Sequence, residues 1–340
     1  MTAIGKNQHF FALLLFLSIY TFHVMSLNLH AASMSERHEQ WMKKYGVVYK
    51  DATEKQKRFL IFKDNVEYIE SFNAVGNKSY KLGINPFTDQ TNDEFRASHT
   101  GFKWSHELRT SQTSFKYENV TDDIPTAVDW RESGAVTPVK EQGKCDCCWA
   151  YSTVAAIEGI YKKASGNLLS FSVQQLVDCN AANNGCNGGN MILAFEYIKE
   201  SGGITTEENY PYLEIEGYCD NNKLGSFKVQ ISGYERIPSN NEEAMLNAVA
   251  NQPVSVGISS EGVDFQAYTD GVFTGECGTE LDHAVAIVGY GATDDGTKYW
   301  IVKNSWGTEW GEEGYMRIAR DTNNGESLCG IAIFVAYPYI

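Results

Sequence analysis

Cysteine is absent from the first 144 residues of this 340-residue chain, and all eight cysteines follow that point. No CxxC pair among them is followed by a second pair or by histidines at zinc-finger spacing. We therefore expect no structural metal ion, and no motif implies a cofactor. Cysteines gathered in one part of an exported chain are typical of disulfides instead.

Basic residues are scarce in the same part of the chain. Residues 124–340 contain 13 lysines and arginines against 29 acidic residues, a net charge of −16, whereas residues 1–123 carry +1. An acidic surface of this kind disfavours nucleic acid and anionic membranes as partners. With 43% hydrophobic and 21% charged residues, the composition is otherwise that of a globular protein without repeats.

The longest apolar run covers residues 10–22 and follows Lys6. It is too short to cross a bilayer comfortably, and it has the basic start and the length of a signal peptide. We expect residues 1–25 to be removed on export, which places the chain in the secretory pathway and leaves vacuole, lysosome and extracellular space open. A buried first helix is the less favoured alternative, because nothing before it caps a helix.

Two regions differ in pattern before and after Ile124. From Ser35 to Asn73, apolar residues recur at intervals of three and four, which predicts two long amphipathic helices. A short alternating stretch follows from Tyr80 to Phe87, and the region from there to Asp123 has no regular pattern and is expected to be an extended linker. After Ile124 the chain is rich in glycines, aromatic residues and short strand-like runs, which predicts a domain boundary.

In the C-terminal region, helical patterns precede strand patterns. The expected helices cover Cys148 to about Lys163, Ser172 to about Cys179 and Met191 to about Lys199. The expected strands cover Val254 to Ile258, His283 to Tyr290, Tyr299 to Asn304 and Tyr315 to Ile318. This order predicts an α+β fold with an α-rich and a β-rich lobe, and a cleft between two lobes is the usual place for a site.

Cys148 is a candidate nucleophile because it opens one of these helices. A helix N-terminus and a nearby imidazolium both favour thiolate over thiol, although on position alone such a cysteine is more often half of a disulfide. The base would be His283, the only histidine after His106, although a lone histidine on a strand is usually structural. Asn304 can hold the other ring nitrogen, and Trp306 can shield that hydrogen bond from water.

These residues resemble a known family. The segment 142–152, His283 and the Asn-Ser-Trp-Gly run at 304–307 are similar to the catalytic stretches of papain-like cysteine proteases. Two prodomain motifs of the cathepsin L-like branch are also reproduced, one by Glu54, Arg58, Phe62, Asn65, Ile69 and Asn73, the other by Gly83, Asn85, Phe87 and Asp89. The chain therefore resembles a plant-type precursor of this family.

The resemblance implies an organisation and an activity. A helical inhibitory prodomain is expected at 35–95, the linker of the prosegment at 96–123 and the peptidase domain at 124–340. The peptidase domain would be the two-lobed papain-like fold, with an α-helical and a β-barrel-like lobe. The expected function is that of a cysteine endopeptidase made as a zymogen.

Roles follow for four residues. Cys148 and His283 would form a thiolate–imidazolium pair that attacks the scissile carbonyl and protonates the leaving amine. Asn304 would orient the ring. The side chain of Gln142 and the backbone N–H of Cys148 would form the oxyanion hole.

Substrate-binding residues follow from the same resemblance. Gly188 and Gly189 match the glycines that pair with an extended peptide, and Trp310 matches the tryptophan that lines the primed side. The pocket for P2, the second residue before the scissile bond, maps to Met191, Gly257, Leu281, Ala284 and Phe334. These residues predict a preference for leucine, valine or phenylalanine at P2, with Phe334 shortening the pocket.

The implied disulfides are Cys145–Cys186, Cys179–Cys219 and Cys277–Cys329, which leave Cys147 unpaired. The chain departs from the family at Asp146 and Cys147, where the family usually has Gly-Ser. Asp146 is expected to raise the pKa of the thiol or to attract a basic side chain at P1, the residue before the scissile bond. Cys147 could compete for Cys186 or bridge to Cys148. The alternative function is therefore a catalytically weak or redox-gated enzyme, or an inactive homologue that acts in storage, defence or binding.

The prosegment of this family lies through the cleft in the non-productive direction and is removed at acidic pH, so maturation is expected near Asp123. The sequons at Asn77 and Asn119 are expected glycosylation sites. The expected partners are peptide or protein substrates, the chain's own prosegment and cystatin-type inhibitors, and the protein is expected to be a monomer. A free-standing inhibitor built from the prodomain alone is disfavoured by the complete region after Ile124.

Overall fold

The computed structural model describes residues 34–104, 115–118, 124–225, 227–322 and 327–340. The chain divides into two compact units, residues 1–68 and 69–340. The signal peptide expected at residues 1–25 and the sequon at Asn119 lie outside the described residues. None of the helices in the described ranges has both the length and the apolar character needed to span a membrane.

The first unit is helical, as the spacing of its apolar residues predicted. Residues 34–45 form one helix, and α2 (Ala52–Ala74) begins in this unit. Trp41, Phe62 and Val66 are buried together, and the His38 ring stacks on Trp41 at a centroid distance of 5.8 Å. The aromatic face of the first helix therefore packs against the apolar face of α2.

The second unit begins with the rest of the prosegment. Strand β1 (Tyr80–Leu82) pairs antiparallel with β5 (Tyr268–Phe273), and helix α3 (Asn92–His99) follows. The expectation of an irregular linker was wrong over α3. Thr91 and Glu94 form a capping box that starts this helix, and it buries Phe95 and His99, one turn apart.

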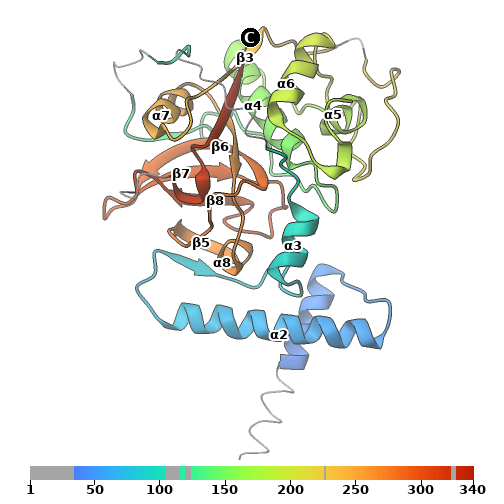
Figure 1. The fold of residues 1–340 in the computed structure, drawn as a ribbon, viewed down its shortest axis with the longest axis vertical. Helices are drawn as coiled ribbons and strands as arrows, with labels where there is room; N and C mark the ends of the chain where they lie inside the picture. The colour runs from blue at the N-terminus through green and yellow to red at the C-terminus, as the bar shows by residue number, and fades with distance from the viewer. Residues whose placement is uncertain (1–33, 105–114, 119–123, 226, 323–326) are drawn as a thin grey trace, which may run out of the picture. The chain divides into compact units, whose positions relative to one another are not determined.

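Three helices form one lobe of this unit, as expected. They are α4 (Cys148–Ser165), α5 (Val173–Cys179) and α6 (Met191–Glu200). Figure 1 shows them gathered beside the strands. Ser172 and Asn190 cap α5 and α6 with side-chain oxygens, and α4 ends at Gly166 with a positive φ of 77°.

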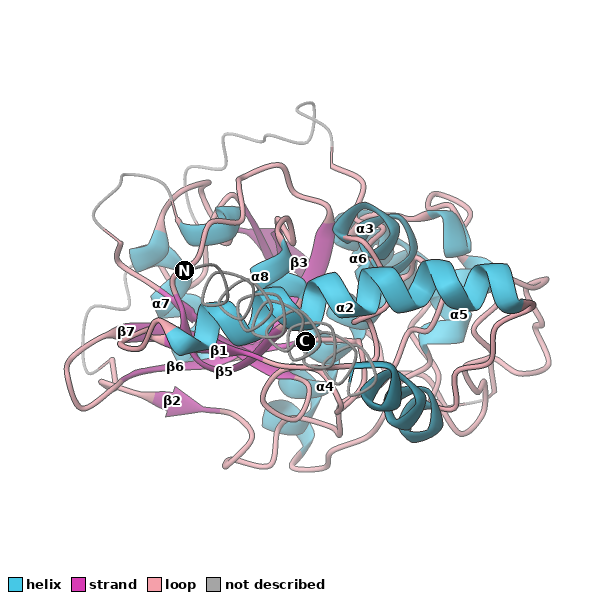
Figure 2. Cartoon of the chain, turned by 90° about the horizontal axis from the view of Figure 1, so that it is seen from below, coloured by secondary structure: helices cyan, strands magenta, loops and turns pink. Residues whose placement is uncertain are grey.

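The other lobe contains a nine-stranded mixed sheet that includes β1 of the prosegment. Its order is β1-β5-β8-β7-β6-β4-β9-β3, with β2 paired to β6, and β5 and β8 run parallel while the other pairs are antiparallel. The remaining strands are β2 (Val128–Asp129), β3 (Gly233–Arg236), β4 (Val254–Ile258), β6 (His283–Ala292), β7 (Lys298–Lys303), β8 (Tyr315–Ala319) and β9 (Phe334–Tyr339). Figure 2 shows β1, β5 and β6 running together.

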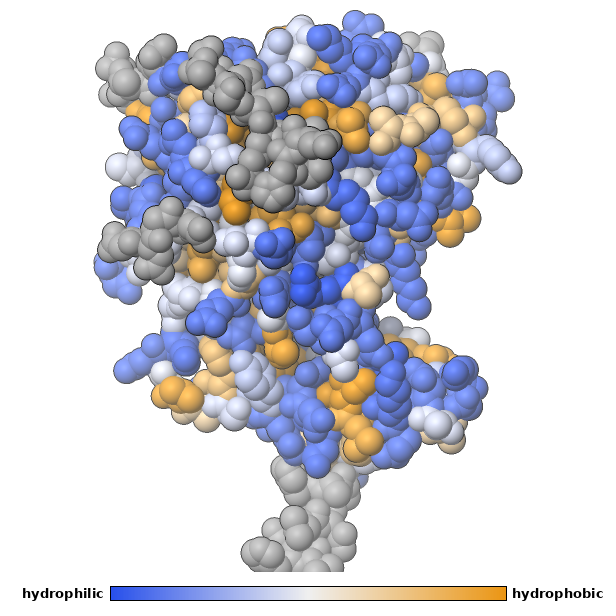
Figure 3. Space-filling model, viewed as in Figure 1, coloured by the Kyte–Doolittle hydropathy of each residue, from blue (hydrophilic) through white to orange (hydrophobic). Residues whose placement is uncertain are grey.

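Strands β4, β6, β7 and β8 are those expected from the sequence, whereas β3, β5, β9 and the helices α7 (Glu242–Asn251) and α8 (Val263–Gln266) were not predicted. Hydrophilic residues cover most of the face drawn in Figure 3, and apolar residues appear there in small groups.

The two lobes meet where α4 packs against β6 and β4. Ser152 Oγ, one turn into α4, donates a hydrogen bond of 2.6 Å to Val285 O on β6, and it also pairs with Ser255 Oγ on β4. Cys148 is the first residue of α4 and His283 is the first residue of β6. The packing of these two elements therefore brings the candidate nucleophile and base to the same end of the lobe boundary.

Candidate active site

The His283 ring is held by a hydrogen bond and by stacking. Its Nε2 lies 2.8 Å from Asn304 Oδ1, and its ring stacks on Trp306 at a centroid distance of 4.4 Å. Because an amide oxygen only accepts, Nε2 carries the proton and Nδ1 of the neutral ring is an acceptor. Nδ1 is buried and has no hydrogen-bond partner within the described ranges, so it is the ring atom left for proton transfer.

The Cys148 thiol lies beside the strand that carries His283. The backbone N–H of Ala284, the residue after His283, hydrogen-bonds the thiol and acts to lower its pKa. Burial acts more strongly and raises the pKa of Cys148 well above its ordinary value, and Asp146 contributes in the same direction. The Asp146 effect has the sign expected from the sequence, but burial is the larger cause.

Burial also governs the histidine. It lowers the pKa of His283 to about 4, although the hydrogen bond that the ring donates to Asn304 opposes this shift. Burial thus shifts the two pKa values in the directions that favour the neutral thiol and the neutral imidazole.

Gln142 is fixed at both ends of its amide. Its Oε1 accepts a hydrogen bond of 2.7 Å from Ser305 Oγ, and its Nε2 donates to His99 O at 3.2 Å and to Cys145 O at 3.1 Å. His99 belongs to the prosegment, and Trp306 Nε1 donates to the same carbonyl at 2.8 Å. A prosegment carbonyl thus occupies the donor that the resemblance assigns to the oxyanion hole.

The prosegment crosses the cleft as an extended chain. Gly189 N–H donates to Gly101 O, and Lys103 N–H donates to Gly189 O, both at 2.8 Å. On the opposite side, the N–H groups of Gly101 and Phe102 donate to Asp282 O at 3.0 and 2.9 Å. The bridge between Phe102 and Gly189 is parallel.

Phe102 fills the pocket that the sequence assigned to P2. Its ring is buried, and it meets the Phe334 ring at a centroid distance of 5.1 Å. A Cβ on Gly257 would lie 2.7 Å from Phe102 Cε1, so only glycine leaves room for this ring. Met191 and Ala284 are buried in the same cluster, and Leu281 packs against it.

The other predicted peptide-binding residues lie in different surroundings. A Cβ on Gly188 would lie 2.6 Å from Gly101 O, so this glycine permits the close approach of the prosegment. Trp310 is fully buried, donates to Gln266 O at 3.1 Å and meets the Trp306 ring at 5.0 Å. It therefore packs edge-on against Trp306, the ring that stacks on His283.

The three disulfides in the structure are Cys145–Cys186, Cys179–Cys219 and Cys277–Cys329. Cys147 and Cys148 are free and buried, so no vicinal bridge joins them. The Cys147 thiol lies 3.0 Å from the Tyr212 hydroxyl, and burial raises its pKa to about 12. Cys147 therefore stays protonated at physiological pH and is a poor nucleophile.

Asp282 and Arg96 make contacts at the cleft that the sequence did not predict. Asp282 accepts two prosegment N–H groups with its carbonyl, and its carboxylate accepts a bond of 2.7 Å from Arg96 Nε on α3. Ser260 N–H and Oγ hold the other carboxylate oxygen at 2.8 and 2.9 Å. The only signal in the sequence was that Asp282 precedes His283.

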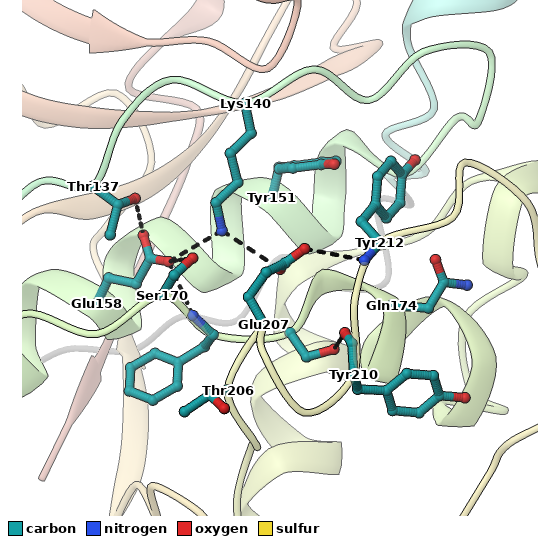
Figure 4. A network of polar contacts seen from close by, with 12 residues as sticks. Thr137, Lys140, Tyr151, Glu158, Ser170, Gln174, Thr206, Glu207, Tyr210 and Tyr212 are labelled. Carbon is teal, nitrogen blue, oxygen red and sulfur yellow. Dashed lines mark hydrogen bonds and ion pairs between the residues drawn. The ribbon is translucent and has the colours of Figure 1, made fainter. Parts of the chain in front are cut away.

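A buried polar network supports α4 behind the site (Figure 4). Glu158, almost fully buried, accepts from Thr137 Oγ1 at 2.6 Å and from Phe171 N–H at 3.1 Å, and it lies 3.4 Å from Lys140 Nζ. Lys303 Nζ donates to Thr137 O at 2.8 Å, and burial lowers the pKa of Lys303 to about 8. The network fixes the residue that precedes Asn304.

Comparison with known families decides what this arrangement is. The papain family cysteine protease model matches residues 124–339. The chain belongs to the papain family of cysteine proteases. The cathepsin propeptide inhibitor domain matches residues 38–95 of this papain-family chain.

Relatives of this papain-family protease cover nearly all of it. It is 50% identical over 337 residues to the senescence-specific cysteine protease SAG12 of Arabidopsis thaliana, across 96% of this chain and 97% of that protein. It is 52% identical over 312 residues to vignain of Vigna mungo, across 90% of this chain and 85% of that protein.

Solved precursors have the same fold. The proform of the ragweed pollen allergen Amb a 11 matches with a TM-score of 0.84 at 43% identity, covering 90% of this chain and 94% of that one. The recombinant stem bromelain precursor matches with a TM-score of 0.83 at 47% identity, covering 91% and 99%. The predicted fold and function are confirmed: this papain-family protein is a cysteine endopeptidase made as a zymogen, and its prosegment is an intramolecular inhibitor.

Proposed function

We propose that Cys148 is the nucleophile of this endopeptidase, that His283 is its general base and acid, and that Asn304 and Gln142 position the ring and stabilise the oxyanion. One observation carries this proposal. An extended backbone, that of the prosegment, binds across Gly189 and Asp282 with a carbonyl against Gln142 Nε2, so the cleft accepts a peptide at the site of these residues.

The chemistry follows from the geometry. Once the prosegment has left, water reaches the site and the Cys148 proton moves to His283 Nδ1. The thiolate attacks the carbonyl carbon of the scissile bond, and the carbonyl oxygen becomes an oxyanion held by Gln142 Nε2 and the Cys148 backbone N–H, worth roughly 3 kcal/mol per donor. His283 then gives its proton to the leaving amine, and it next takes a proton from the water that hydrolyses the thioester.

The substrates we propose are flexible or unfolded chains with an apolar residue at P2. Extended pairing with Gly189 requires a segment free of secondary structure, and the pocket that holds Phe102 is lined by apolar residues. Leucine, valine and phenylalanine fit this pocket, whereas arginine would leave its charge without a partner there. Equal cleavage of substrates with arginine and leucine at P2 would contradict this assignment.

We also propose that the zymogen travels through the secretory pathway to a vacuole, a lysosome or the extracellular space, where cystatin-type inhibitors can meet the monomeric protease. Asn77 supports glycosylation on that route because it is exposed in the turn after α2. Removal of N-linked glycans should reduce the apparent mass of the secreted zymogen, and an Asn77→Gln variant should lack that part of the shift. An unchanged mass would contradict the glycosylation.

Active-site titration tests the proposed roles. The acid-matured protein is treated with an epoxide inhibitor of thiol proteases, with and without dithiothreitol, and the adduct is located by mass spectrometry. Stoichiometric labelling of Cys148 supports the proposal, and a need for reductant would show that Cys147 gates the site. No labelling in either condition would contradict it. Ser305→Ala is a matched variant that should retain the labelling.

A further inference from the structure

Asp146 lies beside the prosegment at Gly101. A Cβ on Gly101 would lie 2.6 Å from the Asp146 Cβ, and Gly101 has a φ of 138° that favours glycine. The residue next to Phe102 thus rests directly on Asp146. This contact joins Asp146 to the subsite adjacent to the P2 pocket.

The direction of the chain identifies that subsite. The prosegment runs parallel to the Gly189 segment, whereas the resemblance to the family implies that a substrate runs in the opposite direction. A substrate whose P2 residue replaces Phe102 therefore has its P1 residue where Gly101 lies, and its P3 residue where Lys103 lies. The P1 side chain of a substrate is consequently the one that meets Asp146.

The Asp146 carboxylate is suited to a cation. Its Oδ1 is buried and has no hydrogen-bond partner among the residues described. Burial raises the pKa of Asp146 to about 6, and the opposing effect comes from the Lys103 ammonium. A Cβ on Gly188 would lie 2.7 Å from Lys103 Cε, so this lysine side chain lies against Gly188.

We propose that Asp146 is a specificity residue that gives the mature protease a preference for lysine or arginine at P1. The proposal rests on the proposed function, because it concerns the same cleft and the same scissile bond. A basic P1 side chain supplies the partner that the carboxylate lacks once Lys103 has left with the prosegment. A neutral P1 side chain leaves the carboxylate unpaired beside the Cys148 thiol, whose pKa it raises.

The test compares kcat/KM for peptides with leucine at P2 and lysine, norleucine or glutamate at P1, using the full-length chain matured at acidic pH. Norleucine matches the lysine stem without its charge. A charge-assisted hydrogen bond predicts that lysine is preferred over norleucine by about 10- to 100-fold. In Asp146→Asn and Asp146→Gly the ratio should fall to about one while cleavage of the norleucine peptide is retained or increases.

Two further variants keep the test specific. Glu214→Gln removes one negative charge near Gly143, away from Gly101, and should leave the ratio unchanged. Asp146→Lys should reverse the order and favour glutamate at P1 over lysine. Rates are divided by the concentration of epoxide-labelled sites, so poorly folded material does not affect the ratios.

The outcomes separate this inference from the proposed function. Equal cleavage of the lysine and norleucine peptides by the unaltered protease would overturn the role of Asp146 and leave the endopeptidase assignment intact. A lysine preference at P3 without one at P1 would also overturn it. Absence of cleavage of every peptide by a site that the epoxide labels would contradict the proposed function instead.

Discussion

Gln142 connects inhibition and catalysis through one amide. Its Nε2 holds the carbonyl of His99 in the zymogen, and Ser305 Oγ fixes the other end of the amide. The orientation of Nε2 is therefore set before a substrate arrives. The same donor that retains the prosegment is the one we assign to the oxyanion.

Replacing Gln142 with alanine should lower kcat by about 100- to 1000-fold, with little change in KM, because the lost donor acts mainly on the transition state. Ser305→Ala keeps the donor but frees the amide to rotate, so its kcat should fall by a smaller factor. Steady-state kinetics on a peptide with leucine at P2 measure both. Similar losses in the two variants would contradict a direct role for Gln142.

His99 makes the closed zymogen sensitive to acid. Its ring stacks on Phe95 at 5.1 Å, and burial lowers its pKa to about 4. Released from the cleft, the ring would titrate near its ordinary value of about 6.5. Falling pH between these values thus favours the released state, by up to about 3 kcal/mol at the lower end.

A His99→Phe variant should therefore mature more slowly than the unaltered zymogen at pH 5, and the two should differ little at pH 7. Phenylalanine keeps the stacking on Phe95 but cannot take up a proton. Gel analysis of processing in matched buffers between pH 4 and 7 gives the comparison, in which the pH dependence of the protease itself cancels. Identical profiles would show that groups other than His99 carry the whole response.

The residues that we propose as catalytic could be selected from the sequence, whereas their contacts with the prosegment could not. Cys148 and His283 stood out because one opens a helix and the other has no alternative in its region of the chain. The contacts of Asp282 with Gly101 and Phe102 depend on the register of a segment that is distant in sequence. Local pattern carries no information about such a register, because its energy comes from backbone groups that every residue has.

The segment from Gly101 to Lys103 lies in the cleft as an extended chain that runs opposite to the direction expected for a substrate. Its backbone makes the hydrogen bonds of a bound peptide, and its one large apolar side chain fills the P2 pocket. Most of the specificity of this short element therefore depends on Phe102. Gly101 contributes mainly because it is small, and Lys103 contributes mainly through its backbone hydrogen bond with Gly189.

Truncation of Phe102 to alanine should give the unprocessed zymogen measurable peptidase activity. Loss of a buried phenylalanine ring costs about 3 kcal/mol or more, which corresponds to roughly 100-fold weaker closure. Hydrolysis of a small peptide by the zymogen at pH 7, before any processing appears on a gel, measures the leak. Phe102→Leu should remain nearly silent, and equal activity of the two variants would argue against the pocket assignment.

Helix α4 depends on a buried ion pair as well as on apolar packing. In Glu158→Gln the Lys140 ammonium, 3.4 Å away, would lose its buried partner, which should lower the free energy of unfolding by about 3 kcal/mol. Glu207, more exposed and 3.7 Å from the same ammonium, provides the control, and Glu207→Gln should cost less than about 1 kcal/mol. Thermal unfolding of the inhibitor-bound mature protein measures both, and equal shifts would contradict the ranking.

Elements with a regular pattern were predictable, and those formed by long-range pairing were not. The strands β4, β6, β7 and β8 were expected because β-branched and aromatic runs are bounded by turns. Helix α3 was missed although Thr91 and Glu94 have the spacing of a capping box, because the helix is short and lies in a polar region. Strand β9 was missed because Pro338 interrupts its pattern, and pairing with β4 and β3 stabilises it.

The division of charge along the chain is consistent with the contacts of the prosegment. Residues 1–123 are close to neutral and the peptidase domain carries −16, so basic prosegment groups meet acidic partners such as Asp282. Acidification also favours release of the buried His99 ring, which is consistent with maturation at low pH.

Cleavage near Ile124 should make the activity of a sample depend on its dilution. All three disulfides lie within residues 145–329, so no covalent bond other than the chain itself holds the prosegment. A cleaved sample assayed at pH 6.5 should gain specific activity on dilution, whereas uncleaved Cys148-containing zymogen diluted in parallel should not. If the specific activity of a cleaved sample is the same at every dilution, the prosegment does not remain bound after cleavage.

Because no disulfide holds the prosegment, inhibition after cleavage depends on the volume into which the prosegment can diffuse. Before cleavage, Phe102 and the groups around it face the cleft at the effective concentration of a tethered ligand, on the order of millimolar. After cleavage the prosegment binds at its bulk concentration, and this concentration falls as the volume of the compartment increases. Hydrolysis of a single bond therefore converts a tethered inhibitor, which dilution cannot dissociate, into a free one that dissociates on dilution.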